Sequence, residues 1–337
     1  MFHQMFVSGA PDVGPRSAAT TAIGLARRRS ARTMNIMKVG AFEISEPVPE
    51  LRDPHALVMI RPWVDVGSVG TLTLARLERH FGAKDLAKLA RPGTFFDFTR
   101  YRPTVRNVEG GGRETTFPNC NVRYAQPETG PDLLFMHLLE PHAMAEDYID
   151  SIVELLKHFR VSVYCRLGAM YDSVPHTRPI VVTGNTGAIQ PRTGAVPPLV
   201  QQAGSTYEGP TTIMNLVTDA VTRMGAATMN LMAHLPHYAQ LEQDHAGTAR
   251  MLQVLSAFYD FPSNLARSRR GEQQYQELSS AVERDPGIKS LVERLEAHYD
   301  ATYEQPEQRG QQRTSDQPSV ELSSEIERFL KGLDQGL

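Results

Sequence analysis

Short apolar runs that alternate with segments of helical periodicity constrain this sequence most. Residues 56–60, 132–139, 161–167, 180–183 and 228–235 have the composition of buried strands. Apolar residues at helical spacing lie between or after them, at 68–81, 143–159, 209–224 and 247–259. Strands that alternate with helices form a largely parallel sheet with helices on both faces. The alternation therefore predicts a three-layer α/β/α sandwich.

One region departs from this alternation and makes the predicted sheet mixed. Residues 104–108 and 114–117 flank the triplet Gly110-Gly111-Gly112, a pattern typical of a hairpin. Residues 94–98 form a further candidate strand. We therefore expect some antiparallel pairing beside a parallel majority.

Composition changes along the chain predict five segments. Residues 1–37 hold five arginines and one acid, and we interpret them as a disordered or untranslated leader, with synthesis starting at Met34 or Met37. Residues 38–262 form the α/β/α domain, and 263–300 form a helical extension that includes a helix starting at Asp285-Pro286. Residues 301–318 are rich in Gln, Glu and Arg and predict a flexible linker. Residues 319–337 predict an amphipathic helix.

Charge and cysteine content limit the compartment and the partners. The chain carries a net charge of −3, whereas nucleic-acid binding usually needs a basic face, so no nucleic-acid partner is expected. Its two cysteines, Cys120 and Cys165, lie far apart and indicate a reducing compartment, the cytoplasm. No apolar run reaches membrane-spanning length, so no membrane contact is expected.

Three short motifs lie where predicted strands run into loops. They are Trp-Val-Asp-Val-Gly-Ser at 63–68, Leu-Gly-Ala-Met-Tyr-Asp-Ser-Val-Pro-His-Thr-Arg-Pro at 167–179, and Tyr-Glu-Gly-Pro-Thr at 207–211 with Pro-His-Tyr at 236–238. In this order, the chain from about residue 50 to 259 resembles the proteasome assembly chaperone family, second-chaperone type. The family often has glycine before the first aromatic residue, where this chain has Pro62.

The resemblance implies a fold similar to phosphorylases and peptide hydrolases. It also implies a protein-binding role, because eukaryotic members are dimeric scaffolds for proteasome α-subunits. We therefore expect self-association, and proteasome-related subunits as partners if the source has them. Fold alone does not fix function.

Several polar residues in these motifs are candidates for a ligand pocket, because ligands bind at the carboxyl ends of strands in open α/β sheets. His176 could act as a base, and Arg178 could hold a carboxylate in two-point geometry. Structural roles compete with these functions: Arg178 could pair with Asp172 or Glu208, and His176 could bind backbone. The complete candidate set is Trp63, Asp65, Gly67, Asp172, His176, Arg178, Tyr207, Glu208 and His237.

The first loop and its tryptophan also have two interpretations. Asp65 and Gly67 belong to a Gly-x-x-Gly turn that could hold an anion, or Asp65 or Ser68 could cap the following helix. Trp63 is an interface anchor if exposed, or a lid over the sheet end. His234 and His237 are three apart at a strand end, which disfavours a metal pair.

These observations favour an assembly-chaperone-like scaffold, with no cofactor and no metal expected. Whether the chain is an enzyme stays open, although no nucleophile elbow accompanies His176. The alternative is a small-molecule hydrolase or transferase that uses a pocket around His176 and Arg178. An ATP-dependent ligase is a weaker alternative, since the sequence has no phosphate-cradling loop.

Overall fold

A ten-stranded mixed sheet organises the described part of the chain. The computed structural model describes residues 36–108, 111–192, 199–201 and 211–304. The strand order in the sheet is β1-β2-β4-β7-β8-β3-β9-β12-β10-β11. These strands are β1 Ile36–Val39, β2 Phe42–Ser45, β3 His55–Arg61, β4 Lys84–Leu89, β7 Asn121–Ala125, β8 Leu133–Leu139, β9 Val163–Asp172, β10 Val182–Asn185, β11 Leu199–Gln201 and β12 Ala227–Pro236.

The four central strands are parallel, and the flanking strands are mostly antiparallel. β8, β3, β9 and β12 pair in parallel, whereas β1, β2, β4 and β7 pair antiparallel up to β8. β10 pairs antiparallel with β12 and parallel with β11. The predicted mixed sheet is confirmed, with its parallel strands at the centre.

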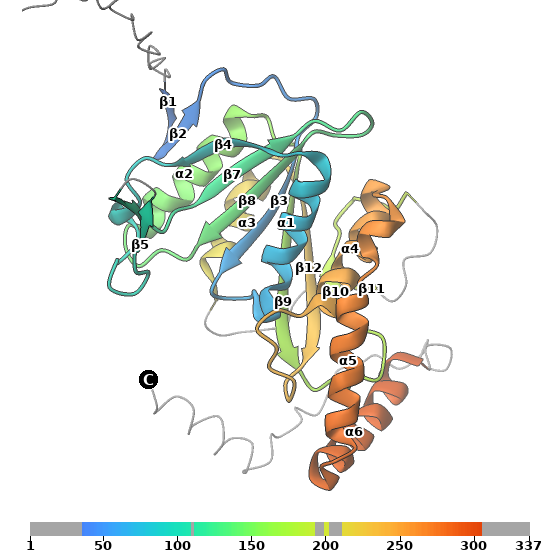
Figure 1. The fold of residues 1–337 in the computed structure, drawn as a ribbon. Helices are drawn as coiled ribbons and strands as arrows, with labels where there is room; N and C mark the ends of the chain where they lie inside the picture. Colours follow the sequence, from blue (N-terminus) through green and yellow to red (C-terminus); the bar gives the residue numbers. More distant parts are fainter. Residues whose placement is uncertain (1–35, 109–110, 193–198, 202–210, 305–337) are drawn as a thin grey trace, which may run out of the picture. The chain divides into compact units, whose positions relative to one another are not determined.

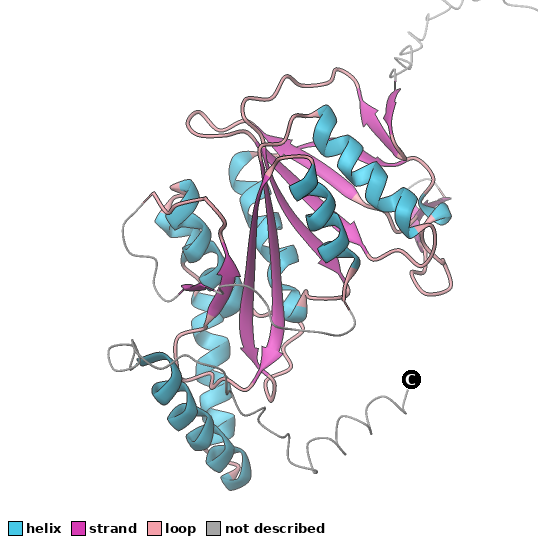
Figure 2. Cartoon of the chain, turned by 180° about the vertical axis from the view of Figure 1, so that it is seen from behind, coloured by secondary structure: helices cyan, strands magenta, loops and turns pink. Residues whose placement is uncertain are grey.

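Helices cover both faces of this sheet, and the alternation of side chains along β3 shows why. Ala56, Val58 and Ile60 belong to one buried cluster, which also takes in α2 (Ala145–His158) and α3 (Ile213–Arg223). Leu57 and Met59 belong to the opposite cluster, with α1 (Val69–Phe81) and α4 (His245–Tyr259). A strand buried on both faces must be apolar throughout. Figures 1 and 2 view the sheet from its two sides, and helices lie in front of it in both.

The predicted hairpin forms a separate two-stranded sheet. Its strands are β5 (Thr104–Val108) and β6 (Gly112–Thr116), and all of their residues are exposed. The predicted strand at 94–98 is wrong. Pro92–Thr94 is a 3₁₀ turn, and Phe95 and Phe96 turn into the core instead. Pro92 fixes the backbone at the first position of this turn, which outweighs the aromatic run that suggested a strand.

Element boundaries differ from the predictions in two further places. β9 continues to Asp172, well past the predicted end at 167, because it pairs with β12 along the whole range from Val163 to Asp172. The helix predicted from 209 begins at Ile213. The sequence patterns also missed β1, β2, β4, β7 and β11, and they included α5 (Arg269–Val282) only as part of the helical extension 263–300.

The C-terminal extension is helical in the part that is described. α5 is followed by α6 (Pro286–Tyr299), which begins at the predicted Asp285-Pro286 site, where the Asp285 carboxylate accepts N–H groups of Gly287 and Ile288. A π-helical turn follows at Asp300–Glu304. The predicted leader up to residue 35, and residues 305–337 of the predicted linker and last helix, lie outside the described residues. None of the described helices has the length and apolar character needed to span a bilayer.

Gly271 shows how closely α5 packs on the body. A methyl group at this position would lie 2.6 Å from the Ala246 nitrogen and 2.8 Å from the Ala246 Cα. Backbone atoms cannot move aside as the end of a flexible side chain can. We therefore expect Gly271→Ala to lower the free energy of unfolding by about 1–3 kcal/mol in urea denaturation.

The matched control is Gly287→Ala in the first turn of α6. A methyl group there would meet only the Asp285 carboxylate, at 3.3 Å. This variant should be neutral or slightly stabilising, because alanine favours helix over glycine. Equal stability of the two variants would contradict the tight packing of α5 against α4.

Candidate functional site

The β3–α1 loop holds an exposed tryptophan on an unusual backbone. Trp63 is 60% exposed. The next residue, Val64, has φ of +59°, and Ser68 has φ of +53°. A β-branched residue in the left-handed region is a genuine outlier, with a cost of about 1–3 kcal/mol. The fold holds it there through the Val64 carbonyl, which accepts the Ala169 N–H at 2.8 Å.

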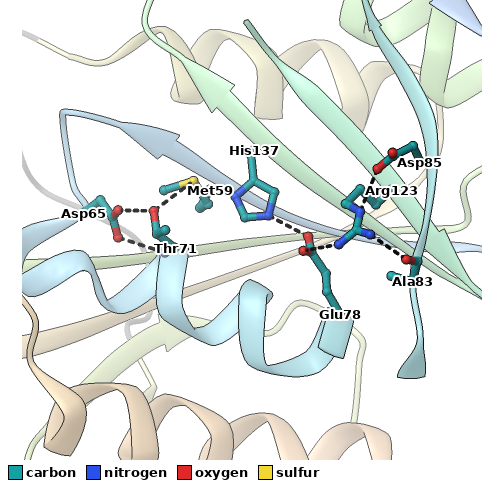
Figure 3. A network of polar contacts seen from close by, with 8 residues as sticks. All are labelled: Met59, Asp65, Thr71, Glu78, Ala83, Asp85, Arg123 and His137. Atoms are coloured by element: carbon teal, nitrogen blue, oxygen red, sulfur yellow. Dashed lines mark hydrogen bonds and ion pairs between the residues drawn. The ribbon is translucent and has the colours of Figure 1, made fainter. Parts of the chain in front are cut away.

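Asp65 serves as an acceptor at the start of α1. Its carboxylate accepts the Gly70 N–H at 2.7 Å. It also accepts the Thr71 N–H at 3.2 Å and the Thr71 hydroxyl at 2.6 Å (Figure 3). Burial raises the pKa of Asp65, and these hydrogen bonds oppose the rise. The geometry agrees with the capping interpretation. Ser68 instead donates its hydroxyl to the Glu242 carbonyl, at 3.0 Å.

Gly67 is required by close packing in the same loop. Its φ is +59°, and a methyl group on it would lie 2.8 Å from the Asp244 Cβ. The Asp244 N–H donates to the Gly67 carbonyl at 2.7 Å, and the Asp244 carboxylate caps α4 through the Gly247 N–H. The Gly-x-x-Gly turn therefore joins the starts of α1 and α4.

Asp172, at the end of β9, belongs to a chain of hydrogen bonds across three strands. Its Oδ2 lies 2.7 Å from His234 Nδ1, and His234 Nε2 lies 2.7 Å from the Thr183 hydroxyl. The hydrogen bond with His234 holds the pKa of Asp172 below its usual value. His234 and Thr183 are both buried. The chain ties β10 and β12 to the end of β9.

His176 is buried against the C-terminal extension. Its Nδ1 lies 2.6 Å from the Tyr238 hydroxyl, and its Nε2 lies 3.0 Å from the Ser279 hydroxyl of α5. Burial lowers the pKa of His176. Both ring nitrogens are thus engaged by side chains of the fold.

Arg178 binds the last described turns of the chain. Its Nε and Nη2 each lie 2.7 Å from one oxygen of Asp300, and its Nη1 lies 3.1 Å from Glu296. Glu296 also accepts the Thr177 hydroxyl. Of the two acids suggested for Arg178, Asp172 is not among its described partners and binds His234 instead, and Glu208 lies outside the described residues. No local pattern predicts that acids from about 120 residues downstream lie against this loop.

The remaining candidates do not complete a ligand site. His237 donates its N–H to the Asp172 carbonyl, at 3.2 Å. Across the described ranges, no three His, Cys, Asp or Glu side chains are grouped as metal ligands. Tyr207 and Glu208 lie outside the described residues. The functional roles of the candidate set remain predictions.

Three hollows lie beside the carboxyl ends of β3 and β8 and along residues 91–98, and we call them together the strand-end groove. One, of about 580 Å³, is lined by Asp65 with Arg61, Tyr101 and Phe117. A second, of about 630 Å³, shares Phe117, and a third, of about 470 Å³, shares Gly93 and Thr94 with the second. Of the described candidates, only Asp65 lines this groove. Its aromatic residues come from 91–101 and 117–121, to which the sequence patterns assigned no functional role.

A second polar network missed by sequence reasoning lies further along α1. Glu78, buried on α1, contacts His137 Nε2 of β8 at 2.6 Å and Arg123 of β7 at 3.0 Å (Figure 3). Burial would raise the pKa of Glu78, but the contacts with His137 and Arg123 outweigh it and lower that pKa. Arg123 also binds Asp85 of β4. The only sign of this network in the sequence is Glu78 itself, an acid at a buried position of α1.

Comparisons with known proteins agree with this fold. A family model described as the PAC2 family matches residues 59–282. Among curated proteins no significant match is found. A Corynebacterium glutamicum protein of unknown function has a similar structure, with a TM-score of 0.68 and 22% identity, over 78% of this chain and 98% of that one.

Two further solved structures have more specific names. A PAC2 family protein from Streptomyces avermitilis is 25% identical, with a TM-score of 0.59, over 71% of this chain and 100% of that one. A proteasome-assembly chaperone homologue from Mycobacterium tuberculosis is 23% identical, with a TM-score of 0.59, over 70% of this chain and 99% of that one. The predicted family resemblance is confirmed.

Arg178→Ala tests whether this loop holds the extension. We expect faster hydrogen exchange in α6 and a lower melting temperature, because Glu296 and Asp300 lose their shared cation. Arg294→Ala is the control, since Arg294 is exposed on α6 and, among the described residues, its guanidinium reaches only Ser290, at 3.4 Å. If Arg178→Ala leaves α6 as protected as in the control, the loop is not its anchor and ligand binding by Arg178 gains weight.

Glu78→Gln tests the buried network through its pH dependence. The lowered pKa means that ionised Glu78 stabilises the fold above its unfolded pKa of about 4.3, and that this stabilisation is lost as pH falls through the folded pKa. The variant should lose about 1–3 kcal/mol near neutral pH and progressively less in acid. Urea denaturation at several pH values measures this difference.

Asp85→Asn is the matched control for the same arginine. The Asp85 side chain is 90% exposed, so its ion pair with Arg123 should contribute less than about 1 kcal/mol at any pH. A pH-independent effect of Glu78→Gln would show that its charge does not stabilise the fold.

Proposed function

Because the chain belongs to the PAC2 family, we propose that it is an assembly-chaperone-like scaffold that works through protein–protein contacts. The observation that carries this proposal is the loop around Trp63. Tryptophan is enriched among the residues that dominate binding energy at protein interfaces. Here Val64, whose backbone lies in the left-handed region, directly follows Trp63, which is 60% exposed. Strain of this kind persists where the surrounding structure enforces it, and it clusters at functional sites.

The contacts that His176 and Arg178 make within the fold support a binding role for the chain rather than catalysis at this loop. Within the described residues, His176 is held by Tyr238 and α5, and Arg178 by α6 and the turn after it. A hydrolase or transferase would need such groups beside an accessible cavity. Instead the loop that carries the family motif anchors the C-terminal helices.

Two kinds of partner follow from this proposal. The first is a second copy of the chain, because most oligomers of soluble proteins are symmetric assemblies of one chain. The second is a proteasome-related subunit, if the source cell has them, by analogy with the named relative from Mycobacterium tuberculosis. Both cysteines are free and buried, which agrees with a reducing compartment such as the cytoplasm. Burial raises the pKa of Cys120 to about 11, which keeps this thiol protonated and unreactive.

Light scattering on the full chain at several concentrations tests the proposal. We expect a concentration-dependent oligomer that Trp63→Ala weakens by about tenfold or more, without a change in thermal stability, because the exposed ring contributes little to the fold. Met144→Ala is the control, since Met144 is 52% exposed on another loop. A strict monomer that also binds no proteasome subunit would contradict the scaffold.

A further inference from the structure

The strand-end groove has an aromatic lining that remains accessible. Phe117 is 51% exposed, and its ring lies 5.4 Å from that of Phe98, which lines the same hollow. Tyr101 lines the neighbouring hollow and donates its hydroxyl to the Glu140 carbonyl, at 3.1 Å. Aromatic side chains fixed in this way offer apolar contact at a low cost in conformational entropy.

Three arginines lie along the same groove with their donors available. Arg61, Arg91 and Arg100 each line one of its hollows, and all three are exposed. In the part of the chain that the structure describes, none of the three guanidinium groups makes a hydrogen bond or an ion pair. Each guanidinium presents a planar fork of N–H groups that matches a carboxylate.

The carboxylates of the groove are engaged inside the fold. Asp65 accepts from Gly70 and Thr71, as described above. Asp97 accepts the Thr99 N–H and the Thr99 hydroxyl, both at 2.8 Å. The groove lining therefore holds three arginines against two carboxylates, a formal charge of +1, so the complementary ligand supplies acceptors and negative charge.

We propose that the strand-end groove binds an acidic peptide segment of a protein partner, with a large apolar side chain of that segment set between Phe98 and Phe117. The inference rests on the proposed function and adds the chemistry of the partner. Aromatic residues and arginine are enriched at the centres of protein interfaces, and both are combined here. Trp63 follows directly after Arg61 and Pro62 of the groove lining, which places the exposed ring in the same loop as the groove.

Fluorescence anisotropy on the full chain tests the proposal. The probe is a short fluorescein-labelled peptide in which glutamates alternate with leucine and phenylalanine. We expect it to bind, and to bind less tightly as sodium chloride is added, because salt screens exposed charges. Arg91→Ala combined with Arg100→Ala should weaken binding by about tenfold or more, and Phe117→Ala should also weaken it.

Matched controls separate a specific groove from general attraction. Arg79→Ala removes an exposed arginine of α1 outside the groove and should leave binding unchanged. A peptide with lysine in place of glutamate should not bind, and one with serine in place of the apolar residues should bind more weakly. Circular dichroism confirms that each variant is folded.

Any of these results would overturn the inference: no binding of the glutamate peptide to the full chain, equal binding of the lysine peptide, or equal losses for Arg79→Ala and the double variant. If the peptide and self-association compete for the groove, its occupant is a second copy of the chain, and this result would also overturn the inference. If the peptide fails while Trp63→Ala still weakens self-association, the inference fails and the scaffold stands.

Discussion

Burial of the central strands β3 and β8 on both faces is the constraint on which the rest of the structure depends. β8, β3 and β9 carry apolar side chains to two separate clusters, and β12 adds to one of them, so each face must be covered by helices. Some polar side chains pair in the middle of the sheet, as Arg166 of β9 does with Asn230 of β12, and others gather at the strand ends. The chain therefore places its strained loop, its family motif and its groove at the carboxyl ends of these strands, where α/β folds commonly bind their ligands.

The end of β9 differs in its contacts from the neighbouring ends of β3 and β8. At the end of β9, the Pro-His-Thr-Arg-Pro loop reaches outward to α5 and α6, and its histidine and arginine hold these helices on the body. At the ends of β3 and β8, exposed arginines and aromatic rings surround an open groove, and Trp63 is exposed beside it. The first is a structural anchor, and the second has the composition of a binding surface.

The sequence predicted the fold where the residues themselves determine it. Alternating strands and helices, Gly82 after α1 and Asp285 before α6 need only local patterns, and the structure contains each of them. β4 was missed because its Lys-Asp-Leu-Ala-Lys-Leu run has charges on its open side and only a few buried positions. The partners of Arg178 could not be predicted, because Glu296 and Asp300 belong to helices that no local pattern docks onto the loop. The groove was missed for a similar reason, since 91–101 and 117–121 meet only in the folded chain.

The central claim is that the surface around Trp63 is a protein interface, and Trp63 is the only tryptophan of the chain. Its fluorescence therefore reports on this surface alone. The measurement is the emission maximum and its quenching by acrylamide, followed as the full chain is concentrated. The account predicts an exposed, easily quenched tryptophan in dilute solution that shifts to the blue and becomes protected as oligomers form. An emission that stays exposed while light scattering shows oligomers would place the interface elsewhere and contradict the account.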